Sequence, residues 1–187
     1  MLGAQAFSFD GLNGLTDPTL PQLAGKDFTV QFDLDTTEQE TSAQAIDLLG
    51  YRVACNAGNF FDVRLGPSAS EVKVNGSLVA PGHLLVEFGD GPMLTSTVAL
   101  NDGEWHEVDI VRTGTTLTLS VDGVVQSSLT LPAGDDVTNT AAWQVANGDP
   151  CVGHDQTQPL SGAMANIYVG PSSGAPNPVT AFPAPTL

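Results

Sequence analysis

The stretch that decides the fold runs from Asp102 to Gly123 and reads DGEWHEVDIVRTGTTLTLSVDG. Apolar and polar residues alternate through Trp105–Thr113 and again through Thr116–Val121, which is the period of a β-strand with one buried face. A Thr-Gly-Thr turn separates these runs, and an Asp-Gly turn follows the second, because glycine adopts positive φ without steric cost. The stretch therefore predicts a three-stranded antiparallel meander, with its third strand beginning just after Gly123.

Short alternating runs recur along the rest of the chain, whereas no segment shows the i, i+3, i+4, i+7 spacing of an amphipathic helix. Turn signals such as Asn-Gly, Asp-Gly and Pro-Gly separate the runs. Many strands without intervening helices indicate a sandwich or a barrel. The further predicted strands are Ala6–Asp10, Phe28–Asp35, Ala45–Gly50, Phe60–Leu65, Glu71–Val74, Leu84–Phe88, Ser96–Val98, Val124–Leu131, Trp143–Val145 and Ala163–Val169.

Length and composition fit one β domain. A chain of 187 residues can build a single two-layer core, and 20 glycines and 13 prolines indicate a turn-rich globular protein. From Gly170 onward the sequence GPSSGAPNPVTAFPAPTL loses its periodicity. We therefore expect a domain over residues 1–170, followed by a proline-rich C-terminal tail or linker over residues 171–187.

Acidic residues dominate the charge. The chain has 21 Asp and Glu against five Lys and Arg, which gives a formal net charge of −16. A surface of that sign repels phosphate backbones and anionic lipid, so we expect neither nucleic acid nor a membrane surface as partner. No apolar run reaches the length of about 18 residues that membrane insertion requires. Neutral sugars, cations and basic proteins remain compatible, and solubility alone also explains the charge.

Cys55 and Cys151 are the only cysteines. They can form a disulfide, stay as two buried thiols, or stay as two unrelated surface thiols. We predict the disulfide, which implies export from the reducing cytosol. The first ten residues, MLGAQAFSFD, lack the basic start and apolar core of a signal peptide, so the prediction of an extracellular or cell-surface location does not rest on them.

Three segments, in order, resemble the laminin G-like branch of the concanavalin A-like lectin and glucanase superfamily. They are AFSFDGLNG with DFTVQFDL near the N-terminus, the stretch DGEWHEVDIVRTGTTLTLSVDG, and LSGAMANIYVG at Leu160–Gly170. The resemblance implies an all-β jelly-roll sandwich of two antiparallel sheets, with ligand loops at its rim. It implies no single function, because members include lectins, carbohydrate-binding appendages, adhesion modules and glycanases.

The resemblance raises the question of catalysis at Glu107 and Asp109. Retaining β-glucanases of this superfamily carry Glu-x-Asp-x-x-Glu, but here Arg112 stands where the second catalytic carboxylate belongs. If Val108 and Ile110 face the core, both acids lie on the opposite, solvated face of the strand. We therefore expect a protein that is not an enzyme.

The resemblance also implies a structural Ca²⁺ that ties the first strand to the last. The matching positions are Asp10 and Asn166, with the carbonyl of Gly11 nearby. Ca²⁺ takes six to eight oxygen ligands, so these side chains would need help from the backbone. The alternative is that Asp10 only forms the turn that precedes Gly11.

A polar loop near Cys151, GDPCVGHDQTQ, is the candidate ligand site. Amide and carboxylate hydrogen bonds, together with an aromatic ring under an apolar sugar face, are what recognition of neutral sugars uses. A bridge between the two cysteines would bring the segment around Cys55 to this loop. The alternative is an ordinary polar loop clamped by a disulfide. The candidate ligand residues are Tyr51, Asn56, Trp143, Asp149, His154, Asp155 and Gln156.

The two tryptophans differ in this respect. Trp143 follows a polar loop and is expected either as a stacking platform or as a core residue, whereas Trp105 is expected in the core. Together these features predict a non-catalytic, lectin-like module of a secreted or cell-surface protein, which binds glycan and has calcium as its one expected cofactor. The alternatives are a protein–protein adhesion or assembly module on the same fold and, third, an atypical glycoside hydrolase.

Overall fold

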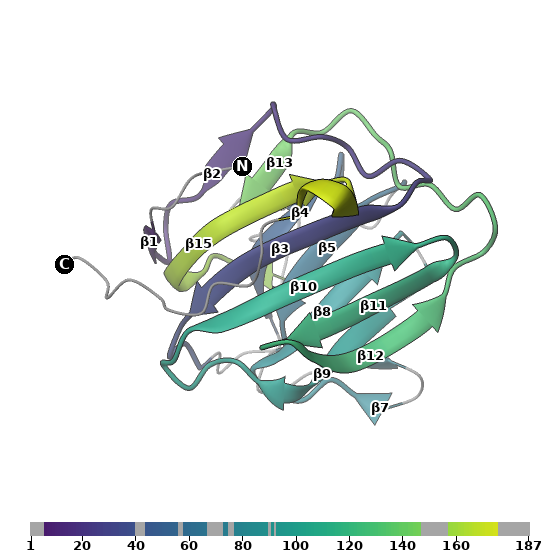
Figure 1. Cartoon of the computed structure of the whole chain (residues 1–187). Coiled ribbons are helices and arrows are strands. Elements are labelled where there is room, and N and C mark those ends of the chain that lie inside the picture. Colours follow the sequence, from purple (N-terminus) through teal and green to yellow (C-terminus); the bar gives the residue numbers. More distant parts are fainter. Residues whose placement is uncertain are drawn as a thin grey trace.

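The computed structural model describes residues 6–39, 44–55, 58–66, 73–74, 77–89, 91, 93–146 and 157–175. Over these residues the chain forms two large sheets that pack face to face, with sheet A in front of sheet B in Figure 1. The predicted all-β, two-sheet jelly-roll sandwich is confirmed. Within the described ranges, no helix has the length and apolar character that crossing a bilayer requires.

Sheet A contains the predicted meander at one edge and the first and last strands of the described chain at the other. All of its neighbouring strands are antiparallel. Its strand order is β1 (Phe7–Asp10), β15 (Ser161–Gly170), β3 (Phe28–Asp35), β10 (His106–Thr113), β11 (Thr116–Val121) and β12 (Val124–Thr130).

Sheet B forms the second layer, and two short pieces accompany it. Its strand order is β2 (Leu15–Asp17), β13 (Trp143–Val145), β4 (Ala45–Tyr51), β5 (Phe61–Leu65), β8 (His83–Phe88) and β9 (Met93–Ala99). In addition, β14 (Thr157–Gln158) pairs with β4 in parallel, and β6 (Lys73–Val74) pairs with β7 (Ser77–Leu78). The strands β2, β7 and β14 were not predicted, because two or three residues are too few to show a period.

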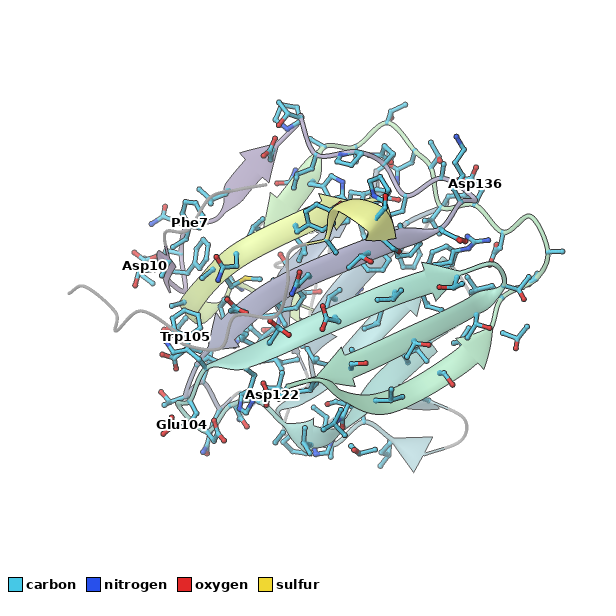
Figure 2. The ribbon with its side chains drawn as sticks, in the orientation of Figure 1. Phe7, Asp10, Glu104, Trp105, Asp122 and Asp136 are labelled. Atoms are coloured by element: carbon cyan, nitrogen blue, oxygen red, sulfur yellow. The ribbon has the colours of Figure 1, made fainter. Side chains whose placement is uncertain are left out.

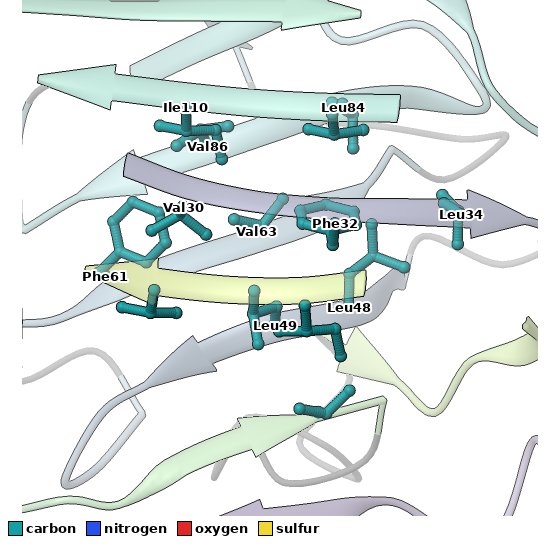
Figure 3. Close-up of a cluster of buried hydrophobic side chains, with 14 of the residues drawn as sticks. Val30, Phe32, Leu34, Leu48, Leu49, Phe61, Val63, Leu84, Val86 and Ile110 are labelled. Atoms are coloured by element: carbon teal, nitrogen blue, oxygen red, sulfur yellow. The ribbon is translucent and has the colours of Figure 1, made fainter. Parts of the chain in front are cut away.

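The core lies between the sheets and is built by strand alternation. In β3, Val30, Phe32 and Leu34 point into it and are fully buried, and Figure 3 shows them facing side chains of sheet B. Burial of one such side chain stabilises the fold by about 1.5–3 kcal/mol. Phe61 and Phe88 stand edge to face, with ring centroids 6.5 Å apart. This core fixes which face of each strand is left for function.

The turn between β11 and β12 has the geometry expected of an Asp-Gly hairpin. Asp122 and Gly123 have φ of 50° and 73°, a pair of positive values that matches the right-handed twist of the flanking strands. Oδ1 of Asp122 accepts a hydrogen bond of 2.9 Å from the backbone N–H of Glu107. The turn thereby ties the second hairpin of the meander to the start of β10.

The last strand ends at Gly170, the residue at which the predicted domain ends. Ser172–Gly174 form a short 3-10 turn, and residues 176–187 lie outside the described residues. The division into a domain and a proline-rich tail therefore stays a prediction.

Candidate functional site

The face of sheet A that points away from the core carries a row of acids and amides. Because side chains alternate along a strand, the polar residues of β3 and β10 share this outer face. The register places Asp33 directly opposite Glu107, and Gln31 directly opposite Asp109. On the other side of β3, β15 adds Asn166. We call this set the acidic strip: Gln31, Asp33, Glu107, Asp109 and Asn166.

A β-bulge brings Asn166 to the strip. Ala165 pairs with Asp33 and Tyr168 pairs with Gln31, so β15 has one more residue than β3 between these two pairs. Asn166 takes φ of 50°, a left-handed value that Asn tolerates better than most residues with a side chain. Its Nδ2 donates a hydrogen bond to Oδ2 of Asp33. The bulge therefore supplies a donor to a buried carboxylate.

Two acceptor groups of the strip have no partner among the residues that the structure describes. Gln31 is 4 % exposed, and its Oε1 is buried without a hydrogen bond. Asp109 is half-buried and makes neither a hydrogen bond nor an ion pair within the described chain. A buried polar group without a partner costs about 1–3 kcal/mol, so a donor that reached these oxygens would be bound favourably.

Burial and mutual repulsion raise the pKa values of two carboxyl groups in the strip. The pKa of Asp33 rises to about 6, mainly through burial, while the hydrogen bond from Asn166 opposes the rise and the charge of Glu107 adds to it. The pKa of Asp109 also rises to about 6, again mainly through burial and then through the charges of Glu107 and Asp33. A positive charge bound beside them would favour the ionised forms.

The expectation for Glu107 and Asp109 is confirmed in one respect and wrong in another. Both side chains lie on the face opposite the core, as the alternation predicted. However, Glu107 is only 4 % exposed, so this face is not simply solvated at its position. The reason is that β10 is a central strand, flanked by β3 and β11, whose side chains shield it on both sides.

At one end of the strip, His106 lies between two aspartates. Its Nδ1 lies 2.8 Å from Oδ2 of Asp122, and its Nε2 lies 3.1 Å from Oδ1 of Asp102. Burial of the ring alone would lower the pKa of His106, but the two hydrogen bonds and the two negative charges outweigh burial and raise it. Figure 2 shows Glu104 and Trp105 at this same end of the sandwich.

The structure confirms the core alternative for Trp143 and corrects the predictions for Tyr51 and Trp105. Trp143 is fully buried, its Nε1 donates to the carbonyl of Pro21 at 2.9 Å, and its ring packs on Tyr51 with centroids 4.7 Å apart. Tyr51 is buried too, and its hydroxyl accepts a hydrogen bond from Leu23 N. Neither ring can stack on a sugar, because sheet B turns both toward the core. Trp105, predicted in the core, is instead partly exposed just before β10.

The remaining loop predictions concern residues outside the described ones. These residues are Asn56, Asp149, Cys151, His154, Asp155 and Gln156. Cys55, which is described, is not a free thiol. The ligand role of this loop and the pairing of Cys55 with Cys151 both stay predictions.

The predicted calcium ligands do not come together. Asp10 pairs with Ser161 at one end of β15, whereas Asn166 lies five residues further along that strand, about 16 Å away at the rise of a β-strand. Oδ1 of Asp10 accepts hydrogen bonds from the N–H groups of Leu12 and Asn13, which is the alternative role of turn former. Asp10, Gly11 and Asn166 therefore do not fit one calcium ion.

No group of three or more His, Cys, Asp or Glu side chains is placed to hold a metal ion within the described ranges. The acidic strip is included in that finding. Calcium binding by any other part of the chain stays a prediction.

Buried ion pairs occupy the outer face of sheet B. Arg52 and Arg64 both reach Oδ2 of Asp62 at 2.7 Å, and Arg64 also reaches Glu87 at 2.6 Å. Burial raises the pKa of Glu87, against the attraction of the two arginines. Arg112 is also buried, on the core side of β10, and donates to the backbone carbonyls of Gly114 and Asp135. The charges of Arg52 and Arg64 are therefore paired with carboxylates of the same sheet, whereas Arg112 is held by backbone carbonyls.

Of the strip, only Asn166 was among the predicted site residues. Glu107 and Asp109 were weighed as a catalytic pair and set aside, and Gln31 and Asp33 were not considered. The alternation in FTVQFDLD does place them on one face of the predicted strand Phe28–Asp35. Only the pairing of β3 with β10, two segments separated by about 70 residues, brings them to Glu107 and Asp109. That pairing carries no local signal in the sequence.

Comparison with known proteins supports this description of the fold. The family model described as laminin G domain matches residues 74–172, which is more than half of the chain. No curated protein matches the chain.

Solved structures with the same fold come from several sources. Domains LG4-5 of the mouse laminin alpha1 chain superpose with a TM-score of 0.64 at 15 % identity, over 90 % of this chain and 43 % of that chain. This chain thus spans less than half the length of that relative. CBM40 of the Ruminococcus gnavus IT-sialidase, bound to alpha2,3 sialyllactose, has a TM-score of 0.65 at 12 % identity, over 89 % and 92 % of the two chains.

A further similar structure is domain 4 of AbnA, a GH43 extracellular arabinanase from Geobacillus stearothermophilus, in complex with arabinotriose. It superposes with a TM-score of 0.56 at 14 % identity, over 88 % of this chain and 69 % of that chain. At such identities these likenesses establish the fold alone. The family match covers the meander and β15, the last strand that the structure describes, and it shows that the chain belongs to the laminin G domain family.

Proposed function

We propose that this module binds glycan without cutting it, and that the acidic strip is its contact surface. The observation that carries the proposal is the buried Oε1 of Gln31, which has no partner among the described residues and lies opposite the unpaired carboxylate of Asp109. Sugar hydroxyl groups are donors of the kind that such oxygens lack.

Two similar structures support the proposal by analogy. The R. gnavus CBM40 domain was solved with sialyllactose and the AbnA domain with arabinotriose, and both share this fold. A module of this kind belongs to a larger secreted or cell-surface protein, and a Cys55–Cys151 bridge would suit that oxidising location. Calcium dependence is part of the proposal, although the three residues expected to bind the ion do not form a site.

The geometry of the acids favours binding over hydrolysis. Asp33 and Glu107 lie directly opposite each other on the adjacent strands β3 and β10. However, Asp33 is 1 % exposed and accepts a hydrogen bond from the amide of Asn166. A general acid must reach the glycosidic oxygen, and a carboxyl enclosed in this way does not. An atypical glycoside hydrolase is therefore the least supported alternative. An assay for newly formed reducing ends on any glycan that binds would overturn this part of the proposal if it detected turnover.

A glycan array, read with and without EDTA, tests the function. Binding that the chelator leaves intact would support a calcium-independent lectin, and binding that the chelator abolishes would support the calcium-dependent form. Substitution of Gln31 by Met removes the unpaired oxygen at similar volume and should weaken binding. Failure to bind any glycan at all would overturn the proposal.

The edge of the sandwich favours a second candidate, a protein–protein adhesion module. Val124 and Val125 of the edge strand β12 are 62 % and 63 % exposed, and this strand carries no charged residue. Uncharged edge strands with exposed apolar side chains are open to pairing with another chain. Substitution of Val125 by Lys should abolish protein adhesion and leave glycan binding intact. The opposite result would argue against the adhesion role of this edge.

A further inference from the structure

The acidic strip is rich in hydrogen-bond acceptors and poor in donors. Three carboxyl groups and Oε1 of Gln31 accept, whereas the only side-chain donors of the strip are the amide groups of Gln31 and Asn166, and that of Asn166 already donates to Asp33. None of the five basic residues of the chain lies on the strip. They lie before β3 (Lys26), on and beside sheet B (Arg52 and Arg64), in β6 (Lys73) and on the core side of β10 (Arg112).

Gln31 gives an independent indication that a ligand group belongs at this place. Its side chain stands between Asp109 on one neighbouring strand and Tyr168 on the other. The hydroxyl of Tyr168 donates to the carbonyl of Pro171 at 2.7 Å and so does not serve Gln31. The oxygen therefore has no donor within the described chain, and a donor from outside reaches it once the Gln31 side chain turns toward the surface.

The charge of the strip narrows the chemistry of that donor. A metal ion is disfavoured, because no three metal-binding side chains converge within the described part of the chain. Anionic glycans are repelled by the carboxylates and by the net charge of −16. Sugar hydroxyls satisfy the acceptors but leave the repulsion between the carboxylates unrelieved. A protonated amine supplies three donors and a positive charge at once.

We infer that the acidic strip selects amino sugars, meaning glycan units that carry a free, protonated amine. The inference rests on the proposed glycan-binding function and names its ligand class. In this arrangement the ammonium group lies between Asp109 and Gln31, which are directly opposite each other on β10 and β3. Neighbouring hydroxyl groups of the same sugar then face the partly exposed Asn166, whereas Asp33 and Glu107 stay enclosed.

Three oligosaccharides of equal length, which differ only in the substituent at one position of each sugar, distinguish the ligand classes. They are a glucosamine oligomer with free amines, the same oligomer with N-acetyl groups, and a glucose oligomer with hydroxyl groups at those positions. Titration calorimetry near neutral pH should give about tenfold tighter binding of the free amine, which is the effect of one charge-assisted hydrogen bond. The preference should shrink as salt is added.

Two matched variants test whether the preference for the free amine depends on the acidic strip. Asp109→Asn keeps the size of the side chain and removes its charge, and it should reduce the affinity for the free amine to that for the glucose oligomer. Asp135→Asn removes an equal charge from the loop that follows β12, and it should keep the preference. Thermal melting of both variants establishes that they are folded before they are titrated.

The possible results are distinct. Equal affinity for the three oligosaccharides would overturn the amino-sugar inference and leave the glycan-binding proposal standing, whereas no binding to any of them or to a glycan array would overturn both. A preference that survives Asp109→Asn would place the amine elsewhere and overturn the inference. If a lysine oligomer binds more tightly than every sugar, and this binding depends on Asp109, the ligand of the strip is a basic peptide and the amino-sugar inference is overturned.

Discussion

His106 and Asp122 are joined through Nδ1 and Oδ2 at 2.8 Å, which links the first residue of β10 to the turn that connects β11 to β12. The other oxygen of Asp122 accepts the backbone N–H of Glu107, so a single carboxylate fixes both the first residues of β10 and the imidazole ring. The ring in turn reaches Asp102 on its other side. One titratable group thus links the meander to the loop before it.

The pH dependence of stability should reveal this link. The pKa of His106 is raised above its ordinary value of 6.5, so its contribution is fully present below about pH 6.5 and is lost as the pH rises through the higher folded-state pKa. Because both aspartates are about half exposed, we expect a loss of less than about 1 kcal/mol. Urea unfolding of His106→Gln should lack this decrease, and a decrease equal to that of the parent would contradict the assignment.

Asp109→Asn should stabilise the fold at neutral pH while it weakens ligand binding. The folded-state pKa of Asp109 is about 6 against an ordinary 3.8, so the folded state holds the proton more tightly, and the penalty of ionisation develops as the pH rises from about 4 to about 6. With a discount for partial exposure, the gain above that window is about 1–2 kcal/mol. Urea unfolding at neutral and at acid pH measures it, and the difference should vanish at acid pH.

The matched control for that experiment is again Asp135→Asn. It should change the unfolding free energy by less than about 0.5 kcal/mol at either pH, as surface substitutions generally do. A gain at neutral pH as large as that of Asp109→Asn would mean that the net charge, rather than the environment of Asp109, sets the effect.

Trp143→Ala should destabilise the protein by about 3–5 kcal/mol, because it empties a fully buried site and leaves the Pro21 carbonyl without its donor. Under conditions where the variant stays folded, its affinity for glycan should match that of the parent. Chemical denaturation and calorimetric titration together check this. A variant of normal stability with lost binding would restore the stacking role that the sequence suggested.

Asp62→Ala should destabilise the fold by about 3–5 kcal/mol, since it removes the more buried of the two carboxylates, those of Asp62 and Glu87, that Arg52 and Arg64 share. Asp136→Ala is a contrasting change, because this exposed carboxylate accepts hydrogen bonds from Thr138 and the backbone of Gly25 and shares no buried ion pair within the described chain. Its cost should stay near 1 kcal/mol. Denaturant midpoints compare the two variants, and equal shifts would show that the ion pairs contribute little.

The Cys55–Cys151 bridge remains to be tested by reduction. In the chain-entropy model, a bridge that closes a loop of roughly 100 residues stabilises the folded state by about 4–5 kcal/mol. Reductant should therefore lower the melting temperature of the parent and leave a Cys55→Ser, Cys151→Ser double variant unchanged. A melting temperature of the parent that full reduction does not alter would argue against the pairing.

Strand period carried most of the information about the fold. The predicted strands Phe28–Asp35 and Thr116–Val121 match β3 and β11 at both ends, because each alternates regularly and ends at a turn. Trp143–Val145 also matched β13, although the period did not reveal that the indole is turned inward.

The candidate site was harder to predict, because it depends on which strands become neighbours. Every residue of β4 is buried, including Tyr51 at its end. The local sequence does not show that both faces of this strand are covered, and Tyr51 was therefore wrongly predicted at an exposed rim. The bulge at Asn166 interrupts the alternation of inward and outward side chains and turns this one toward Asp33. No residue around Asn166 indicates in the sequence that a bulge forms there. Burial of Glu107 likewise arises from neighbouring strands and not from β10 itself.

The burial of the arginines has a practical consequence for measuring the opening of this sandwich. Trypsin cleaves after Lys and Arg, yet Arg52, Arg64 and Arg112 are each no more than 6 % exposed, while Lys26 lies on the surface before β3. Cleavage at the three arginines requires the sheets to separate, so its rate follows the population of opened molecules when reclosing is faster than cutting. Of the four sites at Lys26, Arg52, Arg64 and Arg112, trypsin thus cuts the first in the folded protein and the other three only after the core has opened, so the ratio of these products measures unfolding.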